Sequence, residues 1–278
     1  HVRLENGNVS QSLSVSLING NIHGITKFIL FLSGTRKFDD EIFITELLRN
    51  LNYLAPRTKI TKVKVNNNIG VEMLFQEKAS KELLESNNLR EGPIFEGDET
   101  YRKLLYEKTN NLRIAKNDLS KQTNTIWAKK NNNFKHVSTL GLTYLNQFFL
   151  SNNLLEEVNN KKINFPVVNM DNSFLGLGNI QQNEKLDKFN ILMSALNAQR
   201  GLVNNNRKFY WNSIYSYFEP IYYDGGVNIE TLDLNSAYNV HSYPKQEDVS
   251  TYVEELKEDI GKINFDLFYT NYKKTNIL

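Results

Sequence analysis

Residues 206–226 form an aromatic segment that reads NRKFYWNSIYSYFEPIYYDGG. Two runs rich in Tyr, Phe and Trp, at 207–212 and 216–223, flank a short polar turn, and this pattern predicts a β-hairpin. A hairpin returns the chain to its starting point, so Asn206 before the first strand and Asp224 after the second should lie at the same end. An amide oxygen and a carboxylate brought together in this way suit a hard divalent cation such as Mg²⁺.

The residues around Asp224 allow a functional and a plainer interpretation. Gly225 and Gly226 permit a sharp exit from the strand and the close approach of a phosphate. An Asn at a strand start and an Asp-Gly-Gly turn are nevertheless common where no metal binds.

The aromatic residues of the hairpin also have two interpretations. They could form a platform that stacks on sugars, or they could pack across the strands in a core, which is the commoner use of aromatics in a hairpin.

The first hundred residues read as a β-rich unit with two interposed helices. Apolar residues alternate on both sides of an Asn-Gly-Asn turn and again around an Asn-rich turn, and both patterns predict hairpins. Apolar residues at helical spacing follow Asp39 or Asp40, either of which can cap the helix. The expected elements are hairpins at 9–32 and 58–76, a helix from Asp39 or Asp40, a second helix at 79–88 and a strand at 92–95.

From residue 98 onward the pattern is mostly helical. Helices are expected at 98–117, 136–159, 182–199, 246–259 and 262–272, with an irregular segment at 161–181 and the aromatic hairpin among them. The sequence therefore predicts an α+β fold with a β-rich N-terminal lobe at 1–97 and a mostly helical C-terminal lobe at 98–278. Two such lobes would pack against each other around a cleft.

The composition excludes several classes of function. The chain has no Cys, which excludes disulfide scaffolds, thiolate zinc sites and cysteine nucleophiles. Its 4 His are scattered, so a histidine-built metal site is not expected. The formal net charge of +2, from 33 basic and 31 acidic residues, argues against a nucleic-acid partner. No window approaches the roughly 18 apolar residues of a membrane span, so no transmembrane segment is expected.

The excess of Asn is the unusual feature of the composition, with 40 among 278 residues. A bias toward A/T-rich codons and the filling of turns account for most of them. In such a chain an Asn at a metal-ligand position is weaker evidence than usual, so Asp224 carries more weight than Asn206.

The chain begins with His1, which predicts a fragment or processed form and leaves the compartment undetermined.

Residues 72–99 hold a second group of charges, set in a strand–helix–strand pattern. The ordinary interpretation is a solvated helix face followed by a polar loop. The functional interpretation places Glu77 or Lys78 at the cleft, where a carboxylate can orient a lysine or a nucleotide. These two residues are therefore the candidates for cofactor binding.

Several segments, taken in order, resemble the CotH-like (spore-coat protein H-like) family of atypical kinases. They are DEIF at 40–43 with its helix to 48, LAPRT at 54–58, FQEK with the KELLE helix at 75–85, and the hairpin at 206–224. The resemblance covers roughly residues 25–230. It implies a two-lobed, protein-kinase-like fold that binds ATP and Mg²⁺ and transfers phosphate to a hydroxyl of a protein or glycan acceptor. It also matches Asp224 to the metal-binding Asp, Asn206 to the catalytic-loop Asn and Glu77 to an acidic small-lobe residue.

The chain departs from the kinase pattern at three places. A Gly-rich phosphate loop is missing, and the strand after the 79–88 helix carries Glu96 where a Lys is expected. The loop RGLVN at 200–204 also offers no carboxylate to accept a hydroxyl proton. Phosphoryl transfer depends mainly on positioning and electrostatics, so the missing base lowers activity without forbidding it. Asp187 or Asp233 could replace it if the fold brings either one near.

One alternative to an active kinase follows from these departures, and a second comes from pairs of acidic residues in the sequence. One is a catalytically degenerate kinase-like module that acts as a bacterial cell-surface or structural binding protein. The other is glycoside hydrolysis by paired acids such as Glu219 with Asp224, or Asp98 with Glu99. Proximity in sequence does not establish such a pair, because the two carboxylates must face each other across a substrate.

Overall fold

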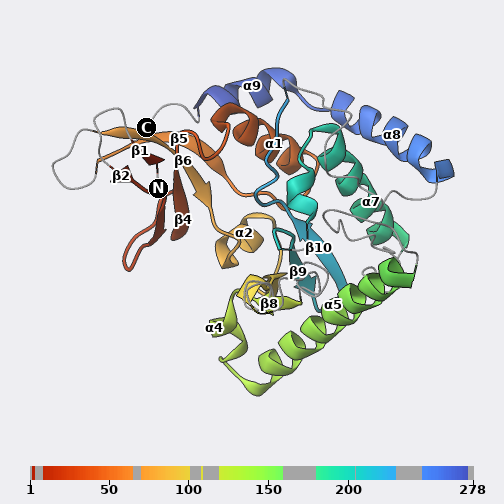
Figure 1. The fold of residues 1–278 in the computed structure, drawn as a ribbon. Coiled ribbons are helices and arrows are strands. Elements are labelled where there is room, and N and C mark those ends of the chain that lie inside the picture. Colours follow the sequence, from red (N-terminus) through yellow and green to blue (C-terminus); the bar gives the residue numbers. More distant parts are fainter. Residues whose placement is uncertain are drawn as a thin grey trace.

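The computed structural model describes residues 2–3, 9–64, 70–100, 108, 119–158, 180–203, 205–229 and 246–274. Within these ranges the protein is an α+β fold with two antiparallel four-stranded sheets and seven α-helices (Figure 1). The α+β class expected from the sequence is therefore confirmed. A separate two-stranded ladder joins β1 (Val2–Arg3) to β2 (Val9–Ser10).

The first sheet contains both hairpins that were expected in the N-terminal part. Alternate residues of its strands point inward, and Phe28 and Phe75 meet at a ring-centroid distance of 4.6 Å in the small core of this sheet. Its strands follow the order β3 (Leu13–Ser16), β4 (Lys27–Leu32), β6 (Val71–Glu77) and β5 (Thr58–Val63).

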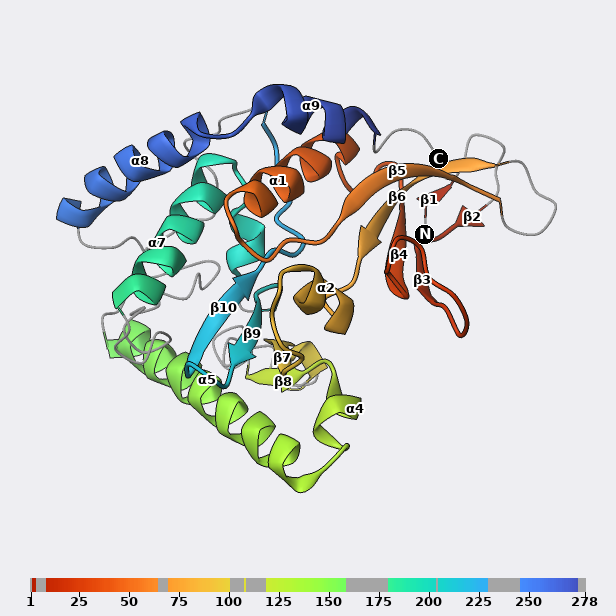
Figure 2. The same cartoon turned by 180° about the vertical axis from the view of Figure 1, so that it is seen from behind.

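Helix α1 (Phe38–Asn50) connects the first sheet to the rest of the molecule. The expected cap at Asp39 or Asp40 is wrong, because the helix begins at Phe38 and both aspartates lie in its first turn. Carboxylates there stabilise the positive end of the helix dipole. Both views place α1 between the first sheet and α7 (Ile180–Ala195) (Figures 1 and 2), and its residues Ile44 and Leu48 are fully buried there.

The second sheet is built around the aromatic hairpin. Its strand order is β10 (Tyr217–Ile221), β9 (Lys208–Asn212), β7 (Ile94–Gly97) and β8 (Ser120–Gln122). The hairpin of β9 and β10 is confirmed, and the strand expected at 92–95 is present as β7. A parallel bridge between Leu54 and Ile221 ties the segment after α1 to the edge of this sheet.

The hairpin aromatics serve mainly as core, so that interpretation is confirmed. Phe209, Trp211 and Phe218 are almost fully buried, together with Phe95, under α5 (Asn132–Val158). Tyr215, in the turn, is exposed. Figure 2 shows α5 running along the second sheet as its cover.

The remaining helices agree with the sequence-based expectations except at their ends. The 3₁₀-helix η2 (Gln199–Leu202) follows α7, and α4 (Thr125–Ala128) was not expected. The helix expected at 98–117 and the irregular segment at 161–181 fall almost entirely outside the described residues. No described helix has the length and apolarity that a membrane span requires. The other helices are α2 (Lys81–Ser86), α8 (Gln246–Gly261) and α9 (Phe265–Lys274).

Candidate functional site

Asp224 leaves the second sheet in an unusual backbone conformation. Its φ is 44°, in the left-handed region that non-glycine residues rarely adopt, and Gly226 follows with φ 65°. Asp and Asn tolerate this region better than other residues that carry a Cβ. A strained backbone of this kind is often found at a functional site, and here it fixes the direction in which the carboxylate points.

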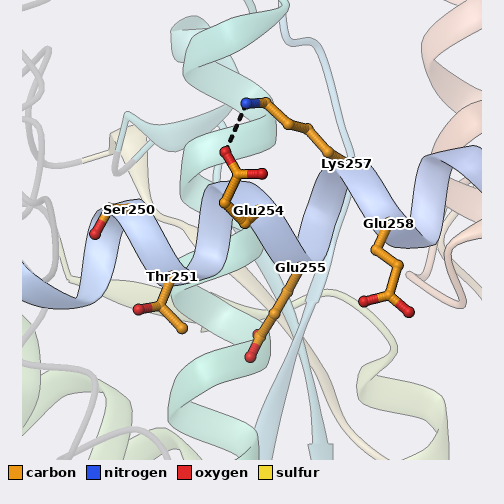
Figure 3. A pocket seen from close by; sticks show the side chains of 6 residues that line it. All are labelled: Ser250, Thr251, Glu254, Glu255, Lys257 and Glu258. Carbon is orange, nitrogen blue, oxygen red and sulfur yellow. Dashed lines mark hydrogen bonds and ion pairs between the residues drawn. The ribbon is translucent and has the colours of Figure 1, made fainter.

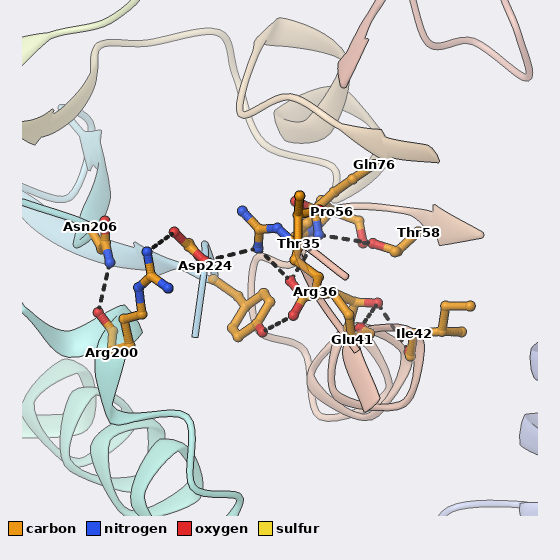
Figure 4. A network of polar contacts seen from close by, with 12 residues as sticks. Thr35, Arg36, Glu41, Ile42, Pro56, Thr58, Gln76, Arg200, Asn206 and Asp224 are labelled. Carbon is orange, nitrogen blue, oxygen red and sulfur yellow. Dashed lines mark hydrogen bonds and ion pairs between the residues drawn. The ribbon is translucent and has the colours of Figure 1, made fainter. Parts of the chain in front are cut away.

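Two arginines hold the Asp224 carboxylate, one at each oxygen (Figure 4). Arg36 Nη1 lies 3.3 Å from Oδ1, and Arg200 Nη2 lies 3.3 Å from Oδ2. Arg36 comes from the loop between β4 and α1, whereas Arg200 belongs to η2. We call Asp224, Arg36, Arg200 and Glu41 the Asp224 cluster.

Arg36 is held firmly by several neighbours. Its side chain is only 8% exposed, and Nη1 also donates to Oε1 of Glu41 at 3.0 Å. The guanidinium carbon lies 4.1 Å from the ring centroid of Phe31 and 5.6 Å from that of Tyr223. Cation–π contacts of this kind add to the ion pair, so Arg36 is a fixed positive charge next to Asp224.

Glu41 is a buried carboxylate with three donors. Besides Arg36, Gln76 Nε2 donates to Oε1 at 3.1 Å and the Tyr222 hydroxyl donates to Oε2 at 2.9 Å. Burial raises the pKa of Glu41 above its ordinary value, and Arg36, Gln76 and Tyr222 act in the opposite direction. Burial, together with the nearby Glu41, also raises the pKa of Tyr222 well above its usual value, so this hydroxyl keeps its proton. A buried charge requires such partners.

Glycines allow η2 to lie directly against the segment that carries Asp224. A Cβ on Gly201 would lie 2.6 Å from Met193 Cε and 3.0 Å from the carbonyl oxygen of Tyr223. A Cβ on Gly225 would lie 2.9 Å from the Tyr222 hydroxyl oxygen. Neither position has room for a side chain, and this close backbone contact places Arg200 beside Asp224.

Asn206 and Asp224 lie at one end of the hairpin and contact the same arginine (Figure 4). Asn206 Nδ2 donates to the carbonyl oxygen of Arg200 at 3.1 Å, whereas Asp224 meets the guanidinium group of that residue. No hydrogen bond joins the Asn206 and Asp224 side chains in the described part of the chain. Within the described residues the amide oxygen of Asn206 accepts no hydrogen bond.

The described side-chain partner of Glu77 is Arg57 and not a member of the Asp224 cluster. The Glu77 side chain is wholly buried and accepts hydrogen bonds from Arg57 Nε at 2.8 Å and Nη2 at 2.6 Å. The backbone N–H of Arg57 donates to the same carboxylate at 3.2 Å. Glu77 thus joins the end of β6 to the beginning of β5, a structural role.

Lys78 belongs to a group of basic side chains between the two sheets. Its Nζ donates to Ser14 Oγ at 2.6 Å, and burial together with Lys27 and Lys208 lowers its pKa. Lys208 forms an ion pair with Glu96, its cross-strand neighbour, and lies 4.1 Å from the ring centroid of Tyr223. Since Tyr223 precedes Asp224, these lysines extend the charged region beyond the Asp224 cluster.

Two side-chain oxygen donors at this end of the hairpin are the candidates for binding a magnesium ion. The candidates are the carboxylate of Asp224 and the amide oxygen of Asn206, both hard oxygen ligands. Across the described ranges no group of three or more His, Asp or Glu side chains could hold a metal ion. Mg²⁺ in nucleotide sites is commonly bound by one or two carboxylates, waters and substrate phosphates. A Mg²⁺ ion bound at this place would therefore have to take most of its ligands from phosphates and water.

The other acidic candidates have partners of their own. Glu219 is buried and pairs with Lys185 at 3.1 Å, and Asp98 accepts from Thr100 at 2.6 Å. Glu99 accepts a hydrogen bond from Asn205. Each of these carboxylates and Asp224 thus has a basic or polar partner, and this pairing does not favour the glycosidase interpretation.

Among the residues that the structure describes, neither Leu202 nor Asp187 supplies a replacement base to the Asp224 cluster. Leu202 is fully buried in the main core. Asp187, on α7, interacts electrostatically with Arg207, whose pKa burial lowers to about 9. Asp233 lies outside the described residues. Arg207, the residue before β9, also donates a hydrogen bond from Nη2 to Asn190 at 3.0 Å, and this pair is buried.

A second candidate location is a shallow depression of about 750 Å³ on α8 (Figure 3). All of its lining residues come from one helix, and Lys257 pairs with Glu254 at 2.7 Å. It offers no convergent polar groups from separate elements, unlike the Asp224 cluster. The lining residues are Ser250, Thr251, Glu254, Glu255, Lys257 and Glu258.

The sequence did not identify Arg36, Glu41, Arg200 or Lys208 as site residues. Glu41 lies in the DEIF segment and Arg200 in the loop before Asn206, but nothing in their local pattern distinguishes them from solvated charges. Comparison of the chain with protein-family models and with curated proteins finds no match. The Asp224 cluster is therefore the main structural indication of function.

Proposed function

We propose that the protein is a CotH-like, kinase-like enzyme that binds ATP with Mg²⁺ at the Asp224 cluster and transfers phosphate to a hydroxyl group. One observation carries the proposal: Arg36, in the loop before α1, pairs both with Glu41 of α1 and with the strand-exit Asp224. In protein kinases, a basic residue paired with a helix glutamate and a metal-binding Asp must both be in place. This chain provides the same charges, with an arginine in place of the lysine.

In this proposal the first sheet and α1 form the small lobe, and the second sheet with its helices forms the large lobe. Asp224 and Asn206 would hold Mg²⁺, which would neutralise charge on the bound phosphates. Arg36 would face those phosphates, and Lys78 and Lys208 would extend the basic surface along them. Glu77 then acts indirectly, because its pairing with Arg57 fixes the strand end that precedes Lys78.

The reaction would break the bond between the γ-phosphorus and the β,γ-bridging oxygen of ATP, which would leave as part of ADP, and would form a bond to the hydroxyl oxygen of a protein or glycan acceptor. The hydroxyl proton would pass to solvent, because Leu202 is buried at the position where a kinase base is expected. Positioning and electrostatics provide most of the catalysis in phosphoryl transfer. A slow enzyme is therefore the expected outcome.

The binding part is tested with Asp224→Asn. Asn keeps the shape of the side chain and tolerates a positive φ, whereas Ala would add backbone strain. ATP with Mg²⁺ should stabilise the parent protein, by about 2.7 kcal/mol at a hundred times the dissociation constant. The variant should lose the Mg²⁺-dependent part of this effect in thermal melts. Asp266→Asn, on the exposed part of α9, is the matched control and should behave as the parent.

If Asp224→Asn binds nucleotide with Mg²⁺ as tightly as the parent, the metal assignment is wrong. The Asp266→Asn control shows whether loss of one negative charge alone has any effect. Titration with ATP in the presence of EDTA separates nucleotide binding from metal binding.

The second candidate is a kinase-like binding module without catalysis, for which the specific observation is the buried Leu202. It keeps the proposed nucleotide site but transfers no phosphate. Incubation with ATP labelled on the γ-phosphate distinguishes the two. Release or transfer of label that disappears in Asp224→Asn supports the enzyme. Stabilisation by ATP with no turnover supports the module.

A further inference from the structure

We propose that Arg200 is an internal competitor for the metal, which closes Asp224 to divalent cations until a phosphate draws the arginine away. This inference rests on the proposed nucleotide site and concerns the order in which its ligands bind. It starts from the observation that both oxygens of the Asp224 carboxylate are already paired with arginines.

The two arginines are held very differently. Arg36 is 8% exposed, pairs with Glu41 as well as Asp224, and lies over the ring of Phe31. Arg200 is 53% exposed, and in the described part of the chain its guanidinium forms a single ion pair, the one with Asp224. Arg200 is therefore the arginine that can leave, whereas Arg36 stays.

The departure of Arg200 changes the net charge of the Asp224 cluster. Asp224 and Glu41 with both arginines carry no net charge when all four groups are ionised. Without Arg200 the same cluster carries one negative charge and exposes Oδ2 of Asp224. A divalent cation is then attracted to an available oxygen ligand. With Arg200 in place, the cation must displace a guanidinium group from the same oxygen.

A phosphate group can draw Arg200 away from Asp224. Guanidinium groups bind phosphate oxygens with two parallel hydrogen bonds, which a single contact to one carboxylate oxygen cannot match. The stem of Arg200 packs on Gly226, where a Cβ would lie 3.3 Å from Arg200 Cδ, so the head group can turn while the stem remains. Arg200 would then contact the nucleotide while Asp224 accepts the metal.

The test compares Arg200→Gln with the parent in two separate binding measurements. In the first, free Mn²⁺ is followed by electron paramagnetic resonance with no nucleotide present. The variant should bind Mn²⁺ about 5-fold more tightly than the parent, the order of effect expected for losing an exposed ion pair. In the second, ATP is titrated in EDTA, and the variant should bind ATP more weakly because a phosphate contact is lost.

Two further variants make the result specific. Arg200→Lys keeps the competing charge and should bind Mn²⁺ as weakly as the parent. Arg49→Gln removes an arginine whose partner is Glu46 at the other end of α1, and should leave both measurements unchanged. Circular-dichroism melts of all variants establish that they are folded.

Each outcome decides one point. If Arg200→Gln binds Mn²⁺ no more tightly than the parent, Arg200 does not compete with the metal. If Mn²⁺ binding rises but ATP binding is unchanged, displacement by a phosphate is wrong. If ATP with Mn²⁺ fails to stabilise the parent protein in thermal melts, the proposed function fails, whatever Arg200→Gln does with Mn²⁺ alone.

Discussion

At the scale of single residues, Glu41 is the group on which the candidate site depends most. Its carboxylate receives Arg36 from the loop before α1, Gln76 from β6 and Tyr222 from the end of β10. Three donors from three elements therefore share one acceptor. Since Arg36 also contacts Asp224, the ionisation of Glu41 influences the charge that a ligand would meet.

The titration of Glu41 gives a prediction for stability. Burial raises its pKa in the folded protein above 4.5, so over the range above that pH the folded chain binds more protons than the unfolded chain. The contribution of Glu41 to the free energy of unfolding is fully present below pH 4.5, and it is lost as the pH rises through the pKa that Glu41 has in the folded protein. Relative to Glu41→Gln, the free energy of unfolding of the parent should fall by at most about 1.4 kcal/mol per pH unit.

Urea unfolding at several pH values between 4 and 8 measures this difference. The exposed Glu85, which pairs with Lys81 on α2, provides the control Glu85→Gln. A difference that instead grows with pH would mean that the three donors lower the pKa of Glu41 more than burial raises it.

At the scale of elements, the contact between η2 and residues 223–225 determines where Arg200 lies. Main chain packs against main chain there, so even a methyl group is too large. The site thus depends on two glycines as much as on the charged residues that they bring together.

Gly201→Ala should therefore lower the free energy of unfolding by about 1–3 kcal/mol, the usual effect of overpacking. It should also move Arg200 away from Asp224. Gly261→Ala, at the end of α8, is a close control because nothing lies within 4 Å of its added Cβ. Urea unfolding measures both variants, and equal stability of Gly201→Ala and the parent would contradict the packing described here.

The sequence was most informative about secondary-structure elements. Alternation and turn residues are local signals, so the hairpins of β3 with β4, β5 with β6 and β9 with β10 could be predicted. The pairing of Glu77 with Arg57 could have been inferred from the register of the second hairpin, since Thr58 lies opposite Gln76. Short elements such as β8 and α4 were missed because a few residues carry no periodicity.

At the scale of the whole molecule, the segment after β10 ties distant parts of the chain together. Tyr222 N–H donates to the carbonyl of Leu54 at 2.8 Å, and Ile229 N–H donates to Asp40 at 3.3 Å. The Tyr222 hydroxyl reaches Glu41, which lies 181 residues earlier in the sequence. Local patterns hold no information on such contacts, which explains why Arg36 and Glu41 were not recognised as site residues.

Tyr222→Phe removes this long-range hydrogen bond and keeps the ring in the core. It should lower the free energy of unfolding by about 1–3 kcal/mol, because a buried carboxylate oxygen of Glu41 loses its donor. It should also weaken ATP binding, since Glu41 orients Arg36. Tyr215→Phe, in the exposed turn of the hairpin, should change neither quantity in urea unfolding and nucleotide titration. An unchanged stability of Tyr222→Phe would mean that the hydroxyl contributes nothing to folding.

The backbone of Asp224 also constrains how this protein can change by mutation. Few residues tolerate its positive φ, and Asn is the closest in shape to Asp. Asp and Asn codons differ by a single base, so one point mutation is enough to make this substitution. Asn at 224 would preserve the fold and remove the carboxylate. A single base change can therefore remove the proposed metal ligand while the folded structure is kept.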